Sequence, residues 1–157
     1  MPSGGMDRQQ YLSNKFGSED NANSVYQRIA DEGEKNKIFF QFNKIAKTPN
    51  SFLSHKLLAY AHNKNKQTKV LELLFYKYFI EGEDIGSVNV LINAAKDADI
   101  YDENIEKYII SEKDNDSLLN EEKHAKNIGI NSVPCFIFNK QIVVNGAQPT
   151  KNFIQII

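Results

Sequence analysis

The sequence predicts an α/β protein that is mostly helical and ends in a strand–turn–strand–helix unit. Apolar residues recur at spacings of three and four after Ser51, the period of an amphipathic helix, and residues 68–81 form a second, more apolar helical stretch. Two later runs, Cys135–Phe138 and Ile142–Val144, are rich in aromatic and β-branched residues that suit strands. Two strands do not form a stable sheet alone, so we expect another strand to complete this one.

The N-terminal third contains two predicted helices. Residues 1–10 are rich in Gly, Ser and Pro and predict a flexible lead-in. A short helix over residues 10–16 ends at Gly17, and Ser18 or Asn21 caps a second helix that ends near Gly33. Residues 38–42, Ile-Phe-Phe-Gln-Phe, predict an extended piece that lies against the core.

The middle of the chain predicts a succession of helices. Thr48 or Asn50 caps the first of them. The second, over residues 68–81, is apolar nearly all round, which is typical of a helix covered on several sides, and Gly82 ends it. Further helices start at Ser87, at Asp102, and at Asp114 or Asp116. The last of them presents three apolar residues inward: Leu118, Ala125 and Ile128.

The segment from Gly129 to Pro149 is the most informative part of the chain. A proline that opens a buried strand cannot donate to the ladder, so Val133–Pro134 marks a special backbone position, and a cis bond is the feature we expect there. Asn139–Lys140 predicts a two-residue turn between the strands. Pro149 is predicted as the first residue of the final helix.

Composition limits the classes of function. At 157 residues the chain fits one domain, and its net charge of −1 gives no reason to expect nucleic acid or an anionic membrane as partner. No apolar run approaches the roughly 20 residues of a membrane span, and the N-terminus lacks a secretory signal. A single cysteine excludes an internal disulfide and fits a reducing compartment. We therefore expect a soluble, cytoplasmic protein.

Four stretches of the sequence resemble one known family. They are Pro49-Asn50-Ser51 with Ser54-His55-Lys56-Leu57, residues 78–85 (Tyr-Phe-Ile-Glu-Gly-Glu-Asp-Ile), Gly129-Ile130 with Val133-Pro134, and residues 144–149 (Val-Asn-Gly-Ala-Gln-Pro). In this order they resemble the DsbA-like thioredoxin-fold family, most closely its FrnE-like branch. The start of the chain, Pro2 to Arg8 and Lys15 to Ser18, is similar to the segment that follows that family's first βαβ unit.

The resemblance implies a thioredoxin-like fold with a large helical insertion. We expect a single domain over residues 1–157, with the insertion at 18–128 and a C-terminal ββα part of the thioredoxin core at 129–157. The family's first βαβ unit carries a Cys-x-x-Cys motif, and this chain has no such motif. We therefore expect an N-terminally truncated member.

The family's activity is protein dithiol–disulfide exchange or isomerisation, without metal or other cofactor, on protein or peptide thiols and disulfides. Exchange takes an attacking thiolate and a resolving thiol, so we expect this chain alone to be inactive. One alternative is a fragment of a 2-hydroxychromene-2-carboxylate isomerase or kappa-class glutathione transferase, which share the architecture. Another is a non-catalytic binding remnant.

The residues around Pro134 are the main candidates for substrate binding. In the family, the residue before this proline faces the redox cysteines and its backbone pairs with an extended substrate, which assigns that role to Val133 and Pro134. Cys135 is the one thiol, and we expect a small buried strand residue rather than a catalytic group. The family's first strand pairs with the strand that starts at Pro134. Its loss would expose an edge and favour a homodimer or a partner that completes the sheet.

The remaining candidates lie in the helical part. His55 and Asn50 match the family's helix motif and are retained as substrate-binding residues of the active face. His55 and His62 are two turns apart, too far for two ligands of one metal, so no metal site is expected. Two sets of aromatic residues are expected to pack in the core: Phe39, Phe40 and Phe42, and Tyr76, Tyr78 and Phe79. The alternative is that they line an apolar cleft for a peptide or a small ligand.

Overall fold

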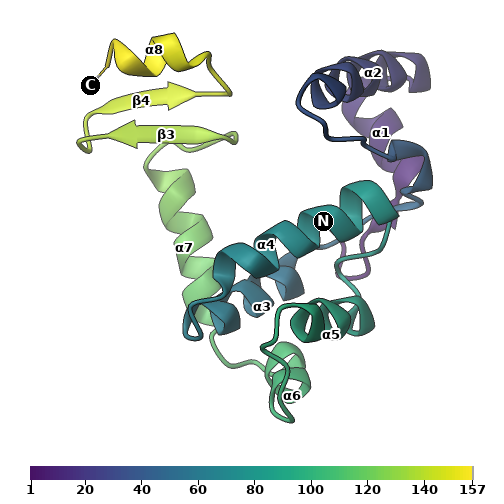
Figure 1. Cartoon of the computed structure of the whole chain (residues 1–157), viewed down its shortest axis with the longest axis vertical. Coiled ribbons are helices and arrows are strands. Elements are labelled where there is room, and N and C mark those ends of the chain that lie inside the picture. Colours follow the sequence, from purple (N-terminus) through teal and green to yellow (C-terminus); the bar gives the residue numbers. More distant parts are fainter. Residues whose placement is uncertain (157) are drawn as a thin grey trace. The chain divides into compact units, whose positions relative to one another are not determined.

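The computed structural model describes residues 1–156 and divides the chain into two compact units, residues 1–113 and 114–157 (Figure 1). We call them unit 1 and unit 2 and describe each by itself. None of the helices within the described residues has the length and apolar character to cross a lipid bilayer. The single domain predicted over residues 1–157, with its division at 18 and 128, stays a prediction.

Unit 1 begins with a strand rather than with the predicted flexible lead-in. Strand β1 (Met6–Asp7) pairs antiparallel with β2 (Lys47–Thr48). The Asp7 side chain then accepts a bond of 3.0 Å from the Gln10 N–H and caps helix α1 (Arg8–Phe16). The Arg8 N–H donates to the Ala46 carbonyl at 3.0 Å. The prediction of a flexible lead-in was wrong for residues 6–10, because composition does not reveal a pairing across 40 residues.

The helices of unit 1 agree with the sequence pattern in number and order. After α1 they are α2 (Glu19–Lys35), α3 (Phe52–His62), α4 (Gln67–Tyr76), α5 (Val88–Asp97) and α6 (Ile105–Ile110). Two short turns were not predicted separately: η1 (Phe42–Lys44), before α3, and the π-helical turn η2 (Lys77–Glu81), which continues α4. Ser18 caps α2, and the Asn50 side chain accepts a bond of 3.0 Å from the Phe52 N–H at the start of α3. The predicted cap at Ser18 is therefore confirmed, whereas the N-cap residue of α3 is Ser51 rather than Thr48 or Asn50 as predicted.

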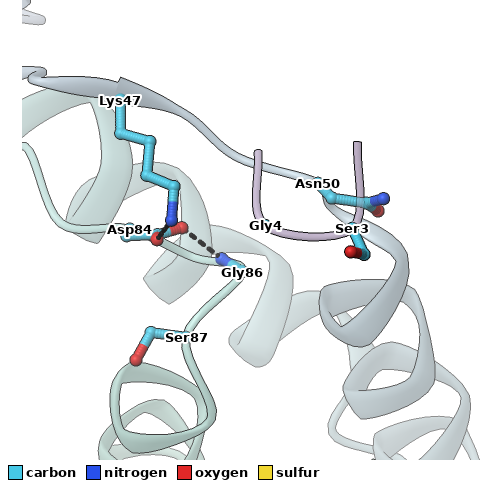
Figure 2. A pocket seen from close by; sticks show the side chains of 7 residues that line it. All are labelled: Ser3, Gly4, Lys47, Asn50, Asp84, Gly86 and Ser87. Carbon is cyan, nitrogen blue, oxygen red and sulfur yellow. Dashed lines mark hydrogen bonds and ion pairs between the residues drawn. The ribbon is translucent and has the colours of Figure 1, made fainter. Parts of the chain in front are cut away.

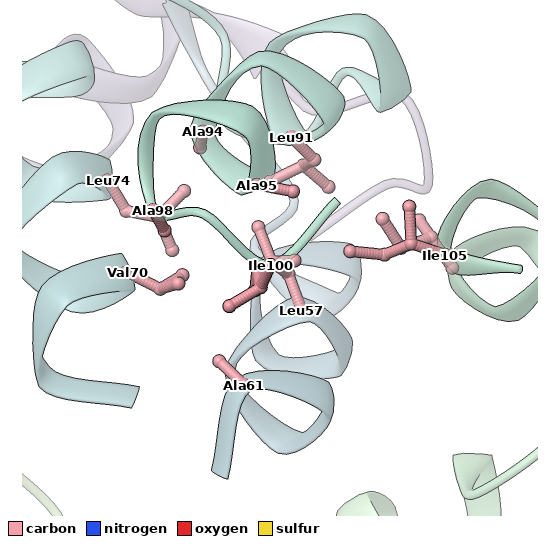
Figure 3. Close-up of a cluster of buried hydrophobic side chains, with 11 residues drawn as sticks. Leu57, Ala61, Val70, Leu74, Leu91, Ala94, Ala95, Ala98, Ile100 and Ile105 are labelled. Carbon is pink, nitrogen blue, oxygen red and sulfur yellow. The ribbon is translucent and has the colours of Figure 1, made fainter. Parts of the chain in front are cut away.

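The core of unit 1 lies between α3, α4, α5 and α6. Figure 3 shows side chains of α3, α4 and α5 converging on Ile100. Leu57, Leu91 and Ile105 are fully buried there. The apolar stripe predicted on α3 is confirmed at Leu57 and Ala61. The helix predicted over residues 68–81 to be covered on several sides has Val70 and Leu74 buried, but Leu71, Phe75 and Tyr76 of α4 are exposed.

Unit 2 consists of helix α7 (Asn115–Asn127), strands β3 (Cys135–Phe138) and β4 (Ile142–Asn145), and helix α8 (Thr150–Ile154). The strands form an antiparallel pair in which Phe138 lies opposite Ile142. The connection therefore has three residues, Asn139 to Gln141, rather than the two predicted, although Asn139 and Lys140 both adopt positive φ. Pro149 precedes α8 as its cap residue and is not its first helical residue.

Candidate functional site

The start of β3 is open to solvent. Val133 is 87% exposed and Pro134 is exposed as well, and the peptide bond between them is cis. The Pro134 carbonyl accepts a bond of 2.8 Å from the Gly146 N–H, so the β4 side of this segment is occupied. The sheet contains only β3 and β4 within the described residues, so the other edge of β3 pairs with no strand there. This edge presents backbone groups to which an extended chain can bond.

Cys135 lies on the sheet face opposite helix α8. The Phe153 ring of α8 packs against the rings of Phe136 and Phe138 at centroid distances of 4.8 and 5.9 Å. Because side chains alternate along a strand, Cys135 and Ile137 point to the other face. Cys135 is half-buried there rather than buried as predicted.

Asn50 lies in unit 1, at a polar pocket of about 290 Å³ (Figure 2). The pocket lies between the N-terminal segment, the start of α3 and the loop before α5. It is lined by Ser3, Gly4, Lys47, Asn50, Asp84, Gly86 and Ser87. The Asn50 amide donates weak bonds to the carbonyls of Met1 and Pro2, at 3.4 and 3.3 Å.

An ion pair crosses this pocket. Lys47 Nζ lies 2.7 Å from an Asp84 carboxylate oxygen, and the other oxygen accepts from the Gly86 N–H at 2.9 Å. A side chain at Gly86 would come within 2.9 Å of the Asn50 carbonyl, so glycine permits this close approach. The pocket offers both charges and small polar groups, but it contains no thiol. It can bind a polar group and cannot by itself exchange disulfides.

The predicted site residues fall in different units. His55 lies in the first turn of α3 with an exposed side chain, and it does not line the polar pocket. His62 and His124 are exposed as well. Asn50 and His55 belong to unit 1, whereas Val133 and Pro134 belong to unit 2. Their common role in substrate binding stays a prediction.

Some residues of the two aromatic sets pack in the core and others line a cavity, whereas Phe39 is 61% exposed and does neither. Phe42 and Tyr78 are held in a ring cluster, and Tyr78 is buried. Phe40, Tyr76 and Phe79 line an apolar cavity of about 410 Å³. The cavity also includes residues that the sequence interpretation did not select: Ile38, Phe75 and Ile80. Phe75 lies on α4, Ile80 on η2 and Ile38 before η1. Their apolar character was a usable signal, but it was assigned to burial.

Arg8 is a buried residue that sequence reasoning missed. Its Nη1 donates to Thr48 Oγ1 at 3.2 Å and to the Tyr78 hydroxyl at 3.3 Å. The guanidinium also lies 4.8 Å from the centre of the Tyr26 ring, a cation–π distance. Burial raises the pKa of Tyr78, and the neighbouring Arg8 charge acts in the opposite direction. A lone arginine in a polar stretch gives no sequence signal for this position.

Comparison with known proteins identifies the family. The sequence matches the DSBA-like thioredoxin domain over residues 1–157. The chain belongs to this family. The DsbA-like assignment made from the sequence is therefore confirmed, and so is the mostly helical thioredoxin-like fold with a small C-terminal strand pair and helix. None of the curated proteins compared with the chain matches it.

A solved structure shows the same fold. The crystal structure of a probable DsbA oxidoreductase from Streptomyces coelicolor superposes with a TM-score of 0.85 at 19% sequence identity. The match covers 96% of this chain and 65% of that one. The DSBA-like chain described here thus spans about two thirds of that protein's length. At this identity the likeness establishes the fold alone.

The chemistry available to this DSBA-like chain is limited by its thiols. Cys135 is its single cysteine, so the 157 residues cannot form an internal disulfide. Attack of one thiolate on a disulfide gives a mixed disulfide, and a second thiol is needed to release it. The open edge of β3 and the exposed Val133 can bind a polypeptide without any thiol.

Proposed function

We propose that this chain supplies the substrate-facing part of a FrnE-like oxidoreductase that exchanges protein dithiols and disulfides. The observation that carries the proposal is the exposed Val133 next to Pro134, at the start of a strand whose outer edge is open. Membership of the DSBA-like family supports the class of reaction. The cysteine pair that the reaction requires comes from outside these 157 residues, because the chain contains one cysteine.

The substrate in this proposal is an extended polypeptide segment that carries a cysteine. Its backbone bonds to the exposed backbone beside Val133, the recognition mode in which a peptide adds a strand to a sheet edge. Main-chain bonds of this kind accept many sequences, which suits a protein that acts on unfolded chains. The neighbouring strand β3 receives a further strand along Cys135–Phe138, from a partner or from a second copy of the chain.

Peptide binding at Val133 can be measured on the intact chain. The probe is reduced, alkylated insulin B chain, an extended polypeptide that cannot form a disulfide. We expect it to change the backbone amide shifts of Ser132, Val133 and Cys135 in an NMR titration, since Pro134 has no N–H. Val133→Asp should abolish these changes because a desolvated carboxylate is costly at a pairing edge. Val143→Asp is the matched control, since Val143 is also exposed but lies on β4.

The residues whose amide shifts change decide between two peptide-binding sites, Val133 in unit 2 and the apolar cavity in unit 1. Shifts at residues 132–135 that survive Val133→Asp, or that disappear equally in Val143→Asp, would contradict the assigned binding position. Shifts confined to the apolar cavity around Phe40 and Phe79 would move peptide binding to unit 1. An absence of shifts at millimolar peptide would exclude a peptide-binding role for Val133 in this chain.

The catalytic part of the proposal is tested with the insulin reduction assay. We expect the chain alone to reduce insulin no faster than the buffer with dithiothreitol, because release of the mixed disulfide takes a second thiol. Reduction above this background that is lost in Cys135→Ser would show that Cys135 is catalytic and would overturn the prediction.

If another strand completes the sheet, the chain should associate with a partner or with a second copy of itself. The open edge of β3 should make the chain dimeric or poorly soluble at micromolar concentration in the absence of a partner. Light scattering with calorimetry is the measurement. A monodisperse monomer with one cooperative unfolding transition would count against a strand supplied by a second copy.

A further inference from the structure

The apolar cavity of unit 1 belongs to a larger exposed apolar surface. Its lining comes from residues 38–40, helix α4 and the turn η2, and none of the lining side chains is charged. Five large side chains on or beside its walls are between 37% and 61% exposed: Ile38, Phe39, Leu71, Phe75 and Tyr76. Leu71 lies one helical turn before Phe75, so it extends the surface along α4. We call these five side chains, together with the cavity, the apolar face.

Backbone bonds fix both ends of the segment that forms one wall of the cavity. The Ile38 N–H donates to the Gly33 carbonyl at 2.8 Å. The Gln41 N–H donates to the Phe79 carbonyl, also at 2.8 Å. Between these bonds the Phe40 ring lies so close to Gly33 that a Cβ there would come within 2.6 Å of it. The apolar face is therefore ordered before any partner arrives, which lowers the entropic cost of binding.

The area of the apolar face matches the apolar share of one side of a stable interface. A fully exposed large apolar side chain offers roughly 200 Å², so the five partly exposed side chains offer on the order of 500 Å² together. A standard interface removes about 800 Å² per partner from water, and about 56–65% of that area is apolar. A small molecule held in the cavity would leave Phe39 and Leu71 in water, because neither residue lines it.

A second copy of the chain fits the apolar face because a projecting ring and a cavity occur together on it. Phe39 is mostly exposed and does not line the cavity, although both of its neighbours in the chain do. In a two-fold symmetric pair one surface meets itself, so a ring of each copy can enter the cavity of the other. Charge does not oppose this approach. Lys37 and Glu72 border the face with opposite signs, and the net charge of the chain is −1.

We propose that the apolar face is the interface of a two-fold symmetric homodimer, in which Phe39 of each copy packs against the aromatic rings of α4 and η2 of the other. Association removes Phe75 and Tyr76, the most exposed rings of α4, from water. The interface is built from unit 1 alone and does not depend on the proposed function. It also differs from strand pairing at the open edge of β3, which belongs to unit 2.

Sedimentation equilibrium of the full chain at micromolar concentration measures the dissociation constant of the dimer. Phe75→Lys places a charge in the cavity wall and should raise this constant at least about thirtyfold, since central aromatic residues contribute most to binding. Phe39→Lys should have a comparable effect. The matched control is Ile110→Lys, at a residue of α6 that is 64% exposed but lies outside the apolar face, and it should leave the constant unchanged. Val133→Asp, beside the open edge of β3, should also leave it unchanged.

Dilution of the native chain, followed by its amide NMR shifts, shows where two copies meet. The shifts should change at residues 38–41 and 71–80 and stay constant at residues 135–138. A chain that is monomeric at millimolar concentration would overturn the proposal, and so would a dimer that Phe39→Lys leaves intact. Phe39→Lys decides even if Phe75→Lys does not fold, because the Phe39 side chain is mostly exposed.

The same shifts distinguish a second copy from another occupant of the apolar face. Alkylated insulin B chain is the probe for an unfolded polypeptide. Shifts at residues 38–41 and 71–80 that appear only when this peptide is added, and not when the concentration of the chain is raised, would assign the face to a polypeptide and overturn the homodimer. Dimerisation that is lost in Val133→Asp and kept in Phe75→Lys would place the contact at the edge of β3 and would overturn it as well.

Discussion

Units 1 and 2 differ most in what they bury. The main hydrophobic cluster of unit 1 is built largely from helices α3 to α6 and includes the fully buried Leu57, Val70, Leu91 and Ile105. Among residues 114–156, no side chain is buried. Unit 2 is held by its strand pairing and by the Phe153 ring against two phenylalanines of β3. Only unit 1 has a core in the ordinary sense.

The difference shows that local sequence signals and independent stability are separate properties. Unit 2 contains the segment with the most specific sequence pattern, residues 129–149, yet its apolar side chains remain exposed, with Val143 at 54% and Ile154 at 69%. A unit of this size rarely buries enough apolar surface to be stable alone. We therefore expect unit 2 to unfold more easily than unit 1, and each prediction below tests that ranking.

The largest loss of stability is expected from a substitution in the core of unit 1. Leu57→Ala should lower the free energy of unfolding by about 2–5 kcal/mol, because the fully buried side chain leaves a cavity between helices. The measurement is urea unfolding followed by far-ultraviolet circular dichroism. Val143→Ala, the comparison in unit 2, should change the same free energy by less than about 0.5 kcal/mol. Equal losses in the two variants would contradict the ranking.

A smaller loss of stability is expected when the aromatic contact of unit 2 is removed. Phe153→Ala removes two ring pairs with Phe136 and Phe138 and should destabilise the hairpin by about 1 kcal/mol. Amide exchange of β3 and β4 is the measurement. Ile154→Ala, at the exposed neighbouring residue of α8, should leave this exchange unchanged. Faster exchange in α5 of unit 1 upon Phe153→Ala would show that the units do not unfold separately.

Much of this fold was predictable because its signals are local. Periodic apolar residues and caps gave the helices of unit 1, and the two strand-forming runs gave β3 and β4 at nearly their observed bounds. The β1–β2 pairing was not predictable, because Met6–Asp7 and Lys47–Thr48 are too short to carry an alternating pattern. The exposed side of α4 was also missed, since periodicity shows where apolar residues gather and not whether another element covers them.

The candidate site was predicted less completely. Family resemblance selected Asn50, His55, Val133 and Pro134, but sequence spacing does not show which residues surround them. Lys47 and Asp84, which form the ion pair of the polar pocket, are 37 residues apart in the chain. Arg8 and Lys56 were missed for a related reason, because charged residues are usually exposed and a buried one is recognised only from its partners.

The smallest expected effect is a loss of stability at acid pH, and it is confined to unit 1. Asp102 accepts bonds from Lys64 Nζ at 2.8 Å, from the Tyr60 hydroxyl at 2.6 Å and from the Asn104 N–H at 3.0 Å. The bond from Lys64, followed by that from Tyr60, lowers the pKa of Asp102 from 3.8 to about 2. The folded state thus favours the ionised carboxylate. Its stabilising contribution is complete above pH 3.8 and is lost as the pH falls through 2.

Asp102→Asn should therefore destabilise the chain at pH 6 by less than Phe153→Ala does, because exposed ion pairs contribute little. The difference in unfolding free energy between the native chain and this variant should shrink as the pH is lowered from about 4 to 2, in urea titrations that follow unit 1. Asp116→Asn, at an exposed residue of α7, is the control and should leave the acid profile of unit 1 unaltered. A difference that stays constant across this pH range would show that the Asp102 side chain acts through its shape and not through its charge.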